Sequence, residues 1–147
     1  MYERILVPTD GGEHATAALE AALELATIHD ATVHALNVVD TTTSLLTVSK
    51  DEVRAALREV GDDAATNAFA EAESMAAEED VEIETERREG KPDDEILAAA
   101  AAIDADLVVL GTHGRDGVSR RLLGSITERV VRESPVPVLT VRADTDE

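Results

Sequence analysis

The sequence contains no cysteine and no tryptophan, and it has only one tyrosine and one phenylalanine. Without cysteine, the chain forms no disulfide, offers no thiolate to a metal and has no thiol nucleophile. It also has no apolar run near the roughly 20 residues that a membrane-spanning helix needs, so no membrane association is expected. Because the start, MYERILVPTD, lacks the basic residues and the cleavage site of a signal peptide, we expect a cytoplasmic protein.

Positive charge is also scarce. The chain has 13 lysines and arginines against 32 aspartates and glutamates, which gives a net charge of −19. A small protein with this charge repels itself at low salt, whereas salt at about 1 M shortens the Debye length to roughly 3 Å. We therefore predict a halophilic source, the alternative being an ordinary acidic mesophilic protein. Such a chain lacks the basic face that phosphate-backbone binding requires, so no nucleic-acid partner is expected.

Short apolar runs alternate with helical patterns along the chain. We predict strands at 5–7, 33–39, 81–86, 107–110 and 136–141, and helices at 13–29, from 49 to about 79, from 93 to about 103 and at 125–132. This alternation predicts an α/β fold, a Rossmann-like open parallel sheet with helices on both faces. The length suits one domain, 1–147, with a frayed tail at 143–147. Residues 41–48 form either a flap, a contact surface or a cover for the sheet edge.

The strongest functional signal is the stretch GTHGRDGVSRRLLGS at residues 111–125. Gly111, Gly114, Gly124 and Ser125 are spaced as G-x2-G-x9-G-S, between a predicted buried strand and a predicted helix. Glycines let backbone N–H groups approach an anion, and a helix N-terminus adds unpaired N–H groups and a favourable dipole. The stretch therefore predicts a phosphate-binding link. It is not a Walker A sequence, because the Gly-Lys-Ser/Thr that carries the P-loop lysine is missing.

Charge along the chain also favours an anionic ligand at this stretch. Residues 111–134 hold five arginines and three acids, a net of +2, whereas the rest of the chain carries −21. We expect Arg115 to attract phosphate. For Arg120 and Arg121, pairing with acidic neighbours or with a partner subunit is an equal alternative. His113 either contacts phosphate or shapes the loop, and the other three histidines lie at unrelated places, so no histidine metal site is expected.

Ligands of open parallel sheets bind beyond the carboxyl ends of the strands, where the strand order reverses. Asp10 follows the first predicted strand, Asp40 ends the second and Gly111 follows the fourth. If the strand order is 3-2-1-4-5, Asp10 lies beside the glycine stretch. Asp10 then contacts a ribose or a magnesium ion, or it caps the first helix, for which aspartate is well suited.

Several segments in order resemble the universal stress protein family of the nucleotide-binding type. ILVPTDGG, NVVD, GKPDDEI, DLVVLGTHGR and SPVPVLTVR match that family's landmarks over nearly the whole chain, together with the G-x2-G-x9-G-S spacing. The resemblance implies a five-stranded parallel sheet in the order 3-2-1-4-5. It implies ATP, or ADP or AMP, as the ligand, with magnesium. It implies a binding site that comprises Pro8, Thr9, Asp10, Val38, Leu110, Gly111, His113, Gly114, Arg115, Gly124, Ser125 and Ile126.

The same resemblance implies a role for each part of this site. The backbone N–H groups of the spaced glycines and the hydroxyl of Ser125 would hold the phosphates. Asp10 would lie by the ribose, and the backbone of Val38 would meet the adenine edge. Pro8 and Leu110 would form apolar walls, and the other residues named would border the site.

The implied function is that of a cytoplasmic stress-response or signalling protein whose shape or partners change with nucleotide occupancy. One alternative is a slow ATPase or phosphotransferase, although the spacing selects no catalytic base, so at most slow hydrolysis is expected. A second is a dimeric scaffold that needs no nucleotide, against which the intact glycines argue. The last predicted strand, Val136–Val141, has an apolar edge, and the resemblance implies a homodimer through it; the alternative is an edge covered by the tail.

Overall fold

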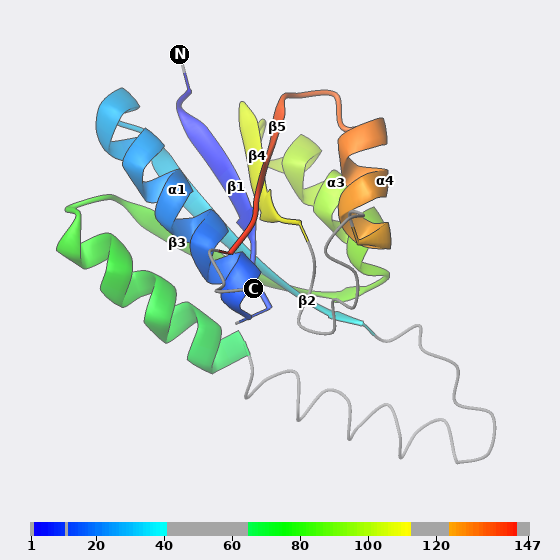
Figure 1. Ribbon diagram of the computed structural model, residues 1–147, viewed down its shortest axis with the longest axis horizontal. Helices are drawn as coiled ribbons and strands as arrows, with labels where there is room; N and C mark the ends of the chain where they lie inside the picture. Colours follow the sequence, from blue (N-terminus) through cyan, green and yellow to red (C-terminus); the bar gives the residue numbers. More distant parts are fainter. Residues whose placement is uncertain (1, 11, 41–64, 113–123, 144–147) are drawn as a thin grey trace.

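The chain folds around a five-stranded parallel sheet with helices on both faces (Figure 1). The computed structural model describes residues 2–10, 12–40, 65–112 and 124–143. Its strands are β1 (Arg4–Pro8), β2 (Thr32–Asp40), β3 (Ile83–Gly90), β4 (Leu107–Gly111) and β5 (Val138–Val141). Its helices are α1 (Glu13–His29), α3 (Pro92–Ala102) and α4 (Ser125–Glu133), with a further helical segment at 65–78. The strand order β3-β2-β1-β4-β5 confirms the predicted fold.

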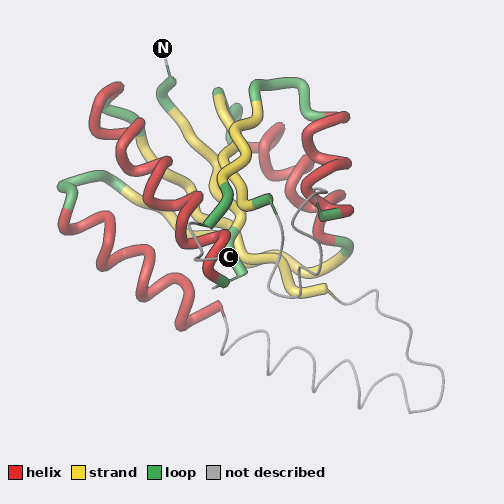
Figure 2. The backbone as a smooth tube through the Cα atoms, viewed as in Figure 1, coloured by secondary structure: helices red, strands yellow, loops and turns green. Residues whose placement is uncertain are grey.

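The central strands are buried on both faces, which explains their continuous apolar sequences. In β1, Ile5 and Val7 belong to the core under α1 and the helix at 65–78, whereas Leu6 belongs to the core under α3 and α4. All three side chains are fully buried. Figure 2 shows the same two layers of helices on either side of the sheet. The sheet therefore separates two apolar cores, and its strand ends are the natural place for polar groups.

The predicted helix at 13–29 has those bounds in the structure. Its buried residues are the six that the helical period placed on one face: Ala15, Ala18, Leu19, Ala22, Leu23 and Ala26. The C-cap of the helix is Asp30, which has a left-handed φ of 56°. The N–H of Asp30 donates to the carbonyl of Ala26.

Strand β3 begins two residues later and ends four residues later than the predicted strand at 81–86. It pairs with β2 along its whole length. Arg87 and Arg88, which follow the predicted strand in sequence, therefore lie within the strand and are partly buried. The alternation of apolar residues is lost here because ion pairs replace it: Arg88 contacts Glu86 at 2.7 Å and Glu95 at 3.2 Å.

The C-terminal segment also differs from prediction. Strand β5 begins at Val138, because the hydroxyl of Ser134 donates to the carbonyl of Val136 at 2.8 Å and holds that residue in a bend. Ala143, expected to begin a frayed tail, is buried, and its N–H donates to Nδ1 of His14 at 3.0 Å. Residues 144–147, the segment 41–48 and the predicted helix start at Ser49 lie outside the described residues.

Two kinds of feature are absent from the ranges that the structure describes. No helix there combines the length and the apolar character needed to cross a bilayer. No three histidine, aspartate or glutamate side chains there gather in an arrangement that could hold a metal ion.

Candidate functional site

The candidate site lies at the carboxyl ends of β1 and β4, where the strand order reverses. Strand β1 pairs with β2 on one side and with β4 on the other. From β1 the chain enters α1 on one face of the sheet, and α4 follows β4 on the opposite face (Figure 1). This reversal is where open α/β sheets bind their ligands.

Asp10 organises the turn between β1 and α1. Its Oδ1 accepts the N–H of Gly12 at 2.8 Å, and Gly12 is the N-cap of α1. Asp10 thus supports the start of the first helix, as one of its two predicted roles requires, although it acts on the cap residue and is not itself the cap. Contact of this carboxylate with ribose or magnesium stays a prediction.

The residue before Asp10 is fixed to β2. The N–H of Thr9 donates to the carbonyl of Leu36 at 2.7 Å, and its own carbonyl accepts a hydrogen bond from Nδ2 of Asn37 at 2.9 Å. Asn37 is only 5% exposed, so this bond lies away from solvent. The carboxyl ends of β1 and β2 are therefore held at a set distance from each other.

The two predicted apolar walls, Pro8 and Leu110, and the predicted adenine contact, Val38, lie at the same end of neighbouring strands. Pro8 is in register with Leu36, so Val38 lies two positions further along β2. Leu110, at the end of β4, belongs to the core under α3 and α4, and Val38 packs against that core. Pro8 and Val38 remain partly exposed, whereas Leu110 is buried. Pro8 and Val38 therefore offer more surface for packing against an apolar ring than Leu110 does.

Gly111 ends β4 directly against the first turn of α1. A Cβ at this position would lie 2.7 Å from the Cβ of His14, 2.8 Å from its carbonyl carbon and 2.9 Å from its carbonyl oxygen. Carbon atoms in proteins pack at about 3.5–4.0 Å, so only a hydrogen fits here. The glycine therefore lets the end of β4 pack directly against the first turn of α1. Its contact with phosphate stays a prediction.

Two hydrogen bonds join the start and the end of the glycine-containing segment. The N–H of Gly124 donates to the carbonyl of Thr112 at 2.8 Å, and Oγ1 of Thr127 donates to the carbonyl of Gly111, also at 2.8 Å. Thr127 is 5% exposed. Thr112 in turn donates its N–H to the carbonyl of Val141 in β5 at 2.9 Å. Helix α4 therefore begins beside the end of β4, in a position fixed from both strands.

The first turn of α4 is the part of the site that suits an anion. The helix begins at Ser125, with Gly124 as its N-cap, and the hydrogen bonds described for it include no side-chain cap. Its first intrahelical N–H is that of Glu128, which donates to the carbonyl of Gly124 at 2.9 Å. The N–H groups of Ser125 and Ile126 precede that bond and carry the positive end of the helix dipole. Ile126 is 38% exposed, which is high for a large apolar residue.

Several predicted site residues lie outside the ranges that the structure describes. These are His113, Gly114 and Arg115, together with Arg120 and Arg121. Their expected contacts with phosphate therefore stay predictions.

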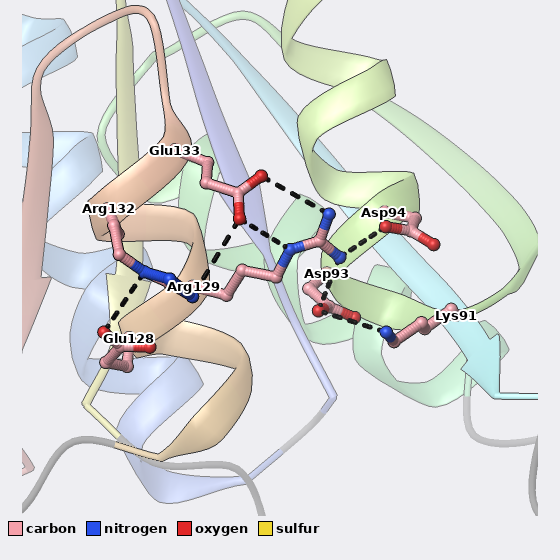
Figure 3. A network of polar contacts seen from close by, with 7 residues as sticks. All are labelled: Lys91, Asp93, Asp94, Glu128, Arg129, Arg132 and Glu133. Carbon is pink, nitrogen blue, oxygen red and sulfur yellow. Dashed lines mark hydrogen bonds and ion pairs between the residues drawn. The ribbon is translucent and has the colours of Figure 1, made fainter.

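Arg129 of α4 links this helix to the first turn of α3 (Figure 3). Its guanidinium donates to Asp93 at 2.8 Å, to Asp94, and to Glu133 at 3.1 Å. Burial raises the pKa of the Asp93 carboxyl, but hydrogen bonds from Arg129 and the backbone outweigh it, so this pKa lies below its usual range. Hydrogen bonds to Asp93, Glu133 and Asp94 raise the pKa of Arg129.

Arg132, one turn further, contacts Glu128 at 3.4 Å and Glu133 at 3.9 Å. Both arginines of α4 thus pair with carboxylates. The two arginines and two glutamates of α4 cancel, so the net +2 of residues 111–134 comes entirely from residues 115–121. The side chains of α4 therefore give the site no excess positive charge. The positive potential that α4 contributes comes from its backbone N–H groups.

Sequence analysis did not single out Asn37 and Thr127, although both hold the site in place. Each is polar, 5% exposed and bonded to a main-chain carbonyl at a strand end. The available signals were an asparagine inside an apolar strand and a threonine three residues before the buried Val130. Buried polar side chains need partners, so such positions point to fixed main-chain contacts.

Comparisons with known proteins agree with this architecture. The model of the universal stress protein family matches residues 1–142. A universal stress protein of Methanocaldococcus jannaschii is 37% identical over 145 residues, which cover 97% of this chain and 83% of the relative. The solved structure of UspA from Lactobacillus plantarum has a TM-score of 0.87 and 32% identity, covering 96% of this chain and 98% of that one. A universal stress protein solved in complex with cAMP has a TM-score of 0.74 and 26% identity, covering 97% and 99%. This chain belongs to the universal stress protein family.

Proposed function

We propose that this protein binds ATP at the carboxyl ends of β1 and β4 and acts in the cytoplasm as a nucleotide-dependent module of stress response or signalling. The observation that carries the proposal is the first turn of α4, held beside the glycine end of β4. Family membership adds support, because one relative has been solved with cAMP, which combines adenine, ribose and phosphate as ATP does.

The groups at this end of the sheet fit an adenine nucleotide. In this proposal the N–H groups of Ser125 and Ile126 and the Ser125 hydroxyl bind phosphate, with the segment that contains Gly114 completing the contacts. The carboxylate of Asp10 accepts from the ribose hydroxyls or binds the magnesium ion that accompanies the phosphates. The backbone of Val38 meets the adenine edge, and the exposed part of Pro8 packs against the ring.

Thermal unfolding with and without ligand tests the proposal. A nucleotide at a hundred times its Kd stabilises a domain by about 2.7 kcal/mol, which raises Tm by roughly 5–10 °C at this size. We expect that shift with ATP and magnesium and not with GTP. It should vanish in Gly124→Val, a variant expected to fold because φ −62° and ψ 155° suit valine. A wild type without an ATP shift, or a shift that persists in the variant, would contradict the proposal.

The nucleotide carried by the purified protein is the simplest independent test. Mass spectrometry of the small molecules released on denaturation should show ATP, ADP or AMP. Protein that carries no nucleotide and binds none on addition would instead favour the dimeric scaffold.

We further propose that two copies associate through β5. The strand forms one edge of the sheet, and its Leu139 is 38% exposed. Unpaired edges with apolar side chains favour strand addition. Light scattering should give the mass of a dimer for the wild type and of a monomer for Leu139→Asp. The matched control is Ile28→Asp on α1, which removes an apolar side chain that is 74% exposed and should leave the dimer intact.

A halophilic source is the remaining part of the proposal, and the net charge of −19 supports it. Screening removes much of the repulsion between these charges as salt approaches molar concentration. We expect Tm to rise between low salt and molar KCl. A Tm that stays constant or falls over this range would contradict the proposal.

A further inference from the structure

Thr127 occupies an unusual place for a polar side chain. It lies in the first turn of α4, is 5% exposed, and its hydroxyl donates to the carbonyl of Gly111 at 2.8 Å. Gly111 is itself fixed on its other side by the first turn of α1, which leaves no room for a Cβ. This hydrogen bond thus connects the start of α4 to the end of β4, where close packing against α1 restricts movement.

The hydroxyl of Thr127 is committed to this main-chain carbonyl and buried, so it is not itself a ligand group. By holding the first turn of α4, the hydroxyl instead affects the direction of the neighbouring N–H groups of Ser125 and Ile126, which follows the axis of that helix. An ion pair between Arg129 and Asp93 also holds the helix against α3, at the next turn (Figure 3). Without the Thr127 bond, this ion pair and the bond from the Gly124 N–H to the carbonyl of Thr112 would remain, and the first turn would be held less firmly between them.

We propose that Thr127 is a positioning residue for the phosphate of the bound nucleotide: its hydroxyl aims the first-turn N–H groups of α4. The inference rests on the proposed function, because it concerns the same site. Hydrogen bonds weaken steeply when donor and acceptor lose alignment, so a small tilt of this turn costs affinity without removing any group that touches the ligand.

Two substitutions separate the hydroxyl from the volume of the side chain. Thr127→Val keeps the shape and removes the donor, whereas Thr127→Ser keeps the donor and removes a methyl group. The control is Thr27→Val, which removes a bond from Oγ1 of an exposed threonine to the carbonyl of Leu23 at 2.9 Å, in the last turns of α1 and away from the site. Calorimetric titration with ATP and magnesium gives Kd, and thermal unfolding without ligand gives Tm.

We expect Thr127→Val to raise Kd by about tenfold, equivalent to about 1.4 kcal/mol. The Kd of Thr127→Ser should stay within about threefold of the wild-type value. Thr27→Val should bind ATP with the wild-type Kd, even where its Tm falls as much as that of Thr127→Val. Normal binding by Thr127→Val, or equal losses in the serine variant and the Thr27 control, would overturn the inference and leave the proposed function intact. No binding by the wild type would refute the proposed function itself.

Should Thr127→Val not fold, amide NMR of the wild type and Thr127→Ser supplies the second measurement. The signals of Ser125 and Ile126 should shift on addition of ATP in both proteins. Signals of these two residues that do not move while ATP binds would overturn the inference.

Discussion

Replacing Gly111 by alanine tests the close packing of β4 against α1. The added methyl carbon would lie 2.7–2.9 Å from three atoms of His14, two of which are main-chain atoms. To restore contacts of about 3.5 Å, the first turn of α1 and the end of β4 must separate by roughly 0.6–0.8 Å. Overpacking of this kind costs about 1–3 kcal/mol, and main-chain obstacles place this site near the upper end.

The gain from a less flexible unfolded chain offsets part of this cost, because glycine-to-alanine changes return about 0.4–1 kcal/mol. We therefore expect Gly111→Ala to lose about 2 kcal/mol of unfolding free energy, a fall in Tm of roughly 4–8 °C. Urea denaturation gives the free energy, and the slope m should not change.

Gly124→Ala is the matched control, since it adds the same atom at the other end of the segment. Its φ of −62° suits alanine, so its stability should stay within about 1 kcal/mol of the wild type. If Gly111→Ala is as stable as the wild type, or no less stable than Gly124→Ala, the contact between β4 and the first turn of α1 is looser than the distances to His14 imply.

Three further outcomes are expected. Hydrogen bonds hold the pKa of Asp93 below its ordinary value of 3.8 despite burial, so ionised Asp93 should stabilise the fold above about pH 4. The Tm gap between wild type and Asp93→Asn should narrow as pH falls below that value, and a gap that stays constant between about pH 5 and about pH 3 would refute this. Asn37→Leu should lower the unfolding free energy by about 1 kcal/mol in urea and weaken ATP binding, because the bond to Thr9 is lost; unchanged values for both would contradict that role. His14→Phe should speed hydrogen exchange of the Ala143 amide by about tenfold by NMR, whereas equal rates would mean that the histidine does not hold the C-terminal segment.

The fold was largely predictable because burial imposes simple periods. The six apolar positions of α1 repeat at helical spacing, and the buried strands are continuous apolar runs. The prediction failed where polar contacts take the place of apolar ones. Glu-Arg-Arg-Glu at the end of β3 has no apolar residue, and its pairing with β2 together with ion pairs such as Arg88 with Glu95 on α3 explains why it continues as a strand.

The location of the candidate site was predictable from topology and glycine spacing, but its internal supports were not. The contact between Gly111 and His14 joins residues almost a hundred positions apart, and no local pattern encodes it. The pairing of Arg129 with Asp93, 36 residues away, also depends on how α3 and α4 pack. The sequence therefore could not show which carboxylates neutralise Arg129.

The middle position of β1 in the sheet has a consequence for synthesis of the chain. Its start is tied to Asp106, whose carboxylate accepts the N–H of Glu3 across a separation of 103 residues. Until β4 leaves the ribosome, β1 has one unpaired edge, and its apolar residues lack the cover that β4 and α4 provide. Chains that end before Leu107 should therefore stick to one another or to chaperones, and completed chains should fold slowly for their size, since the central pairing waits for a partner made late.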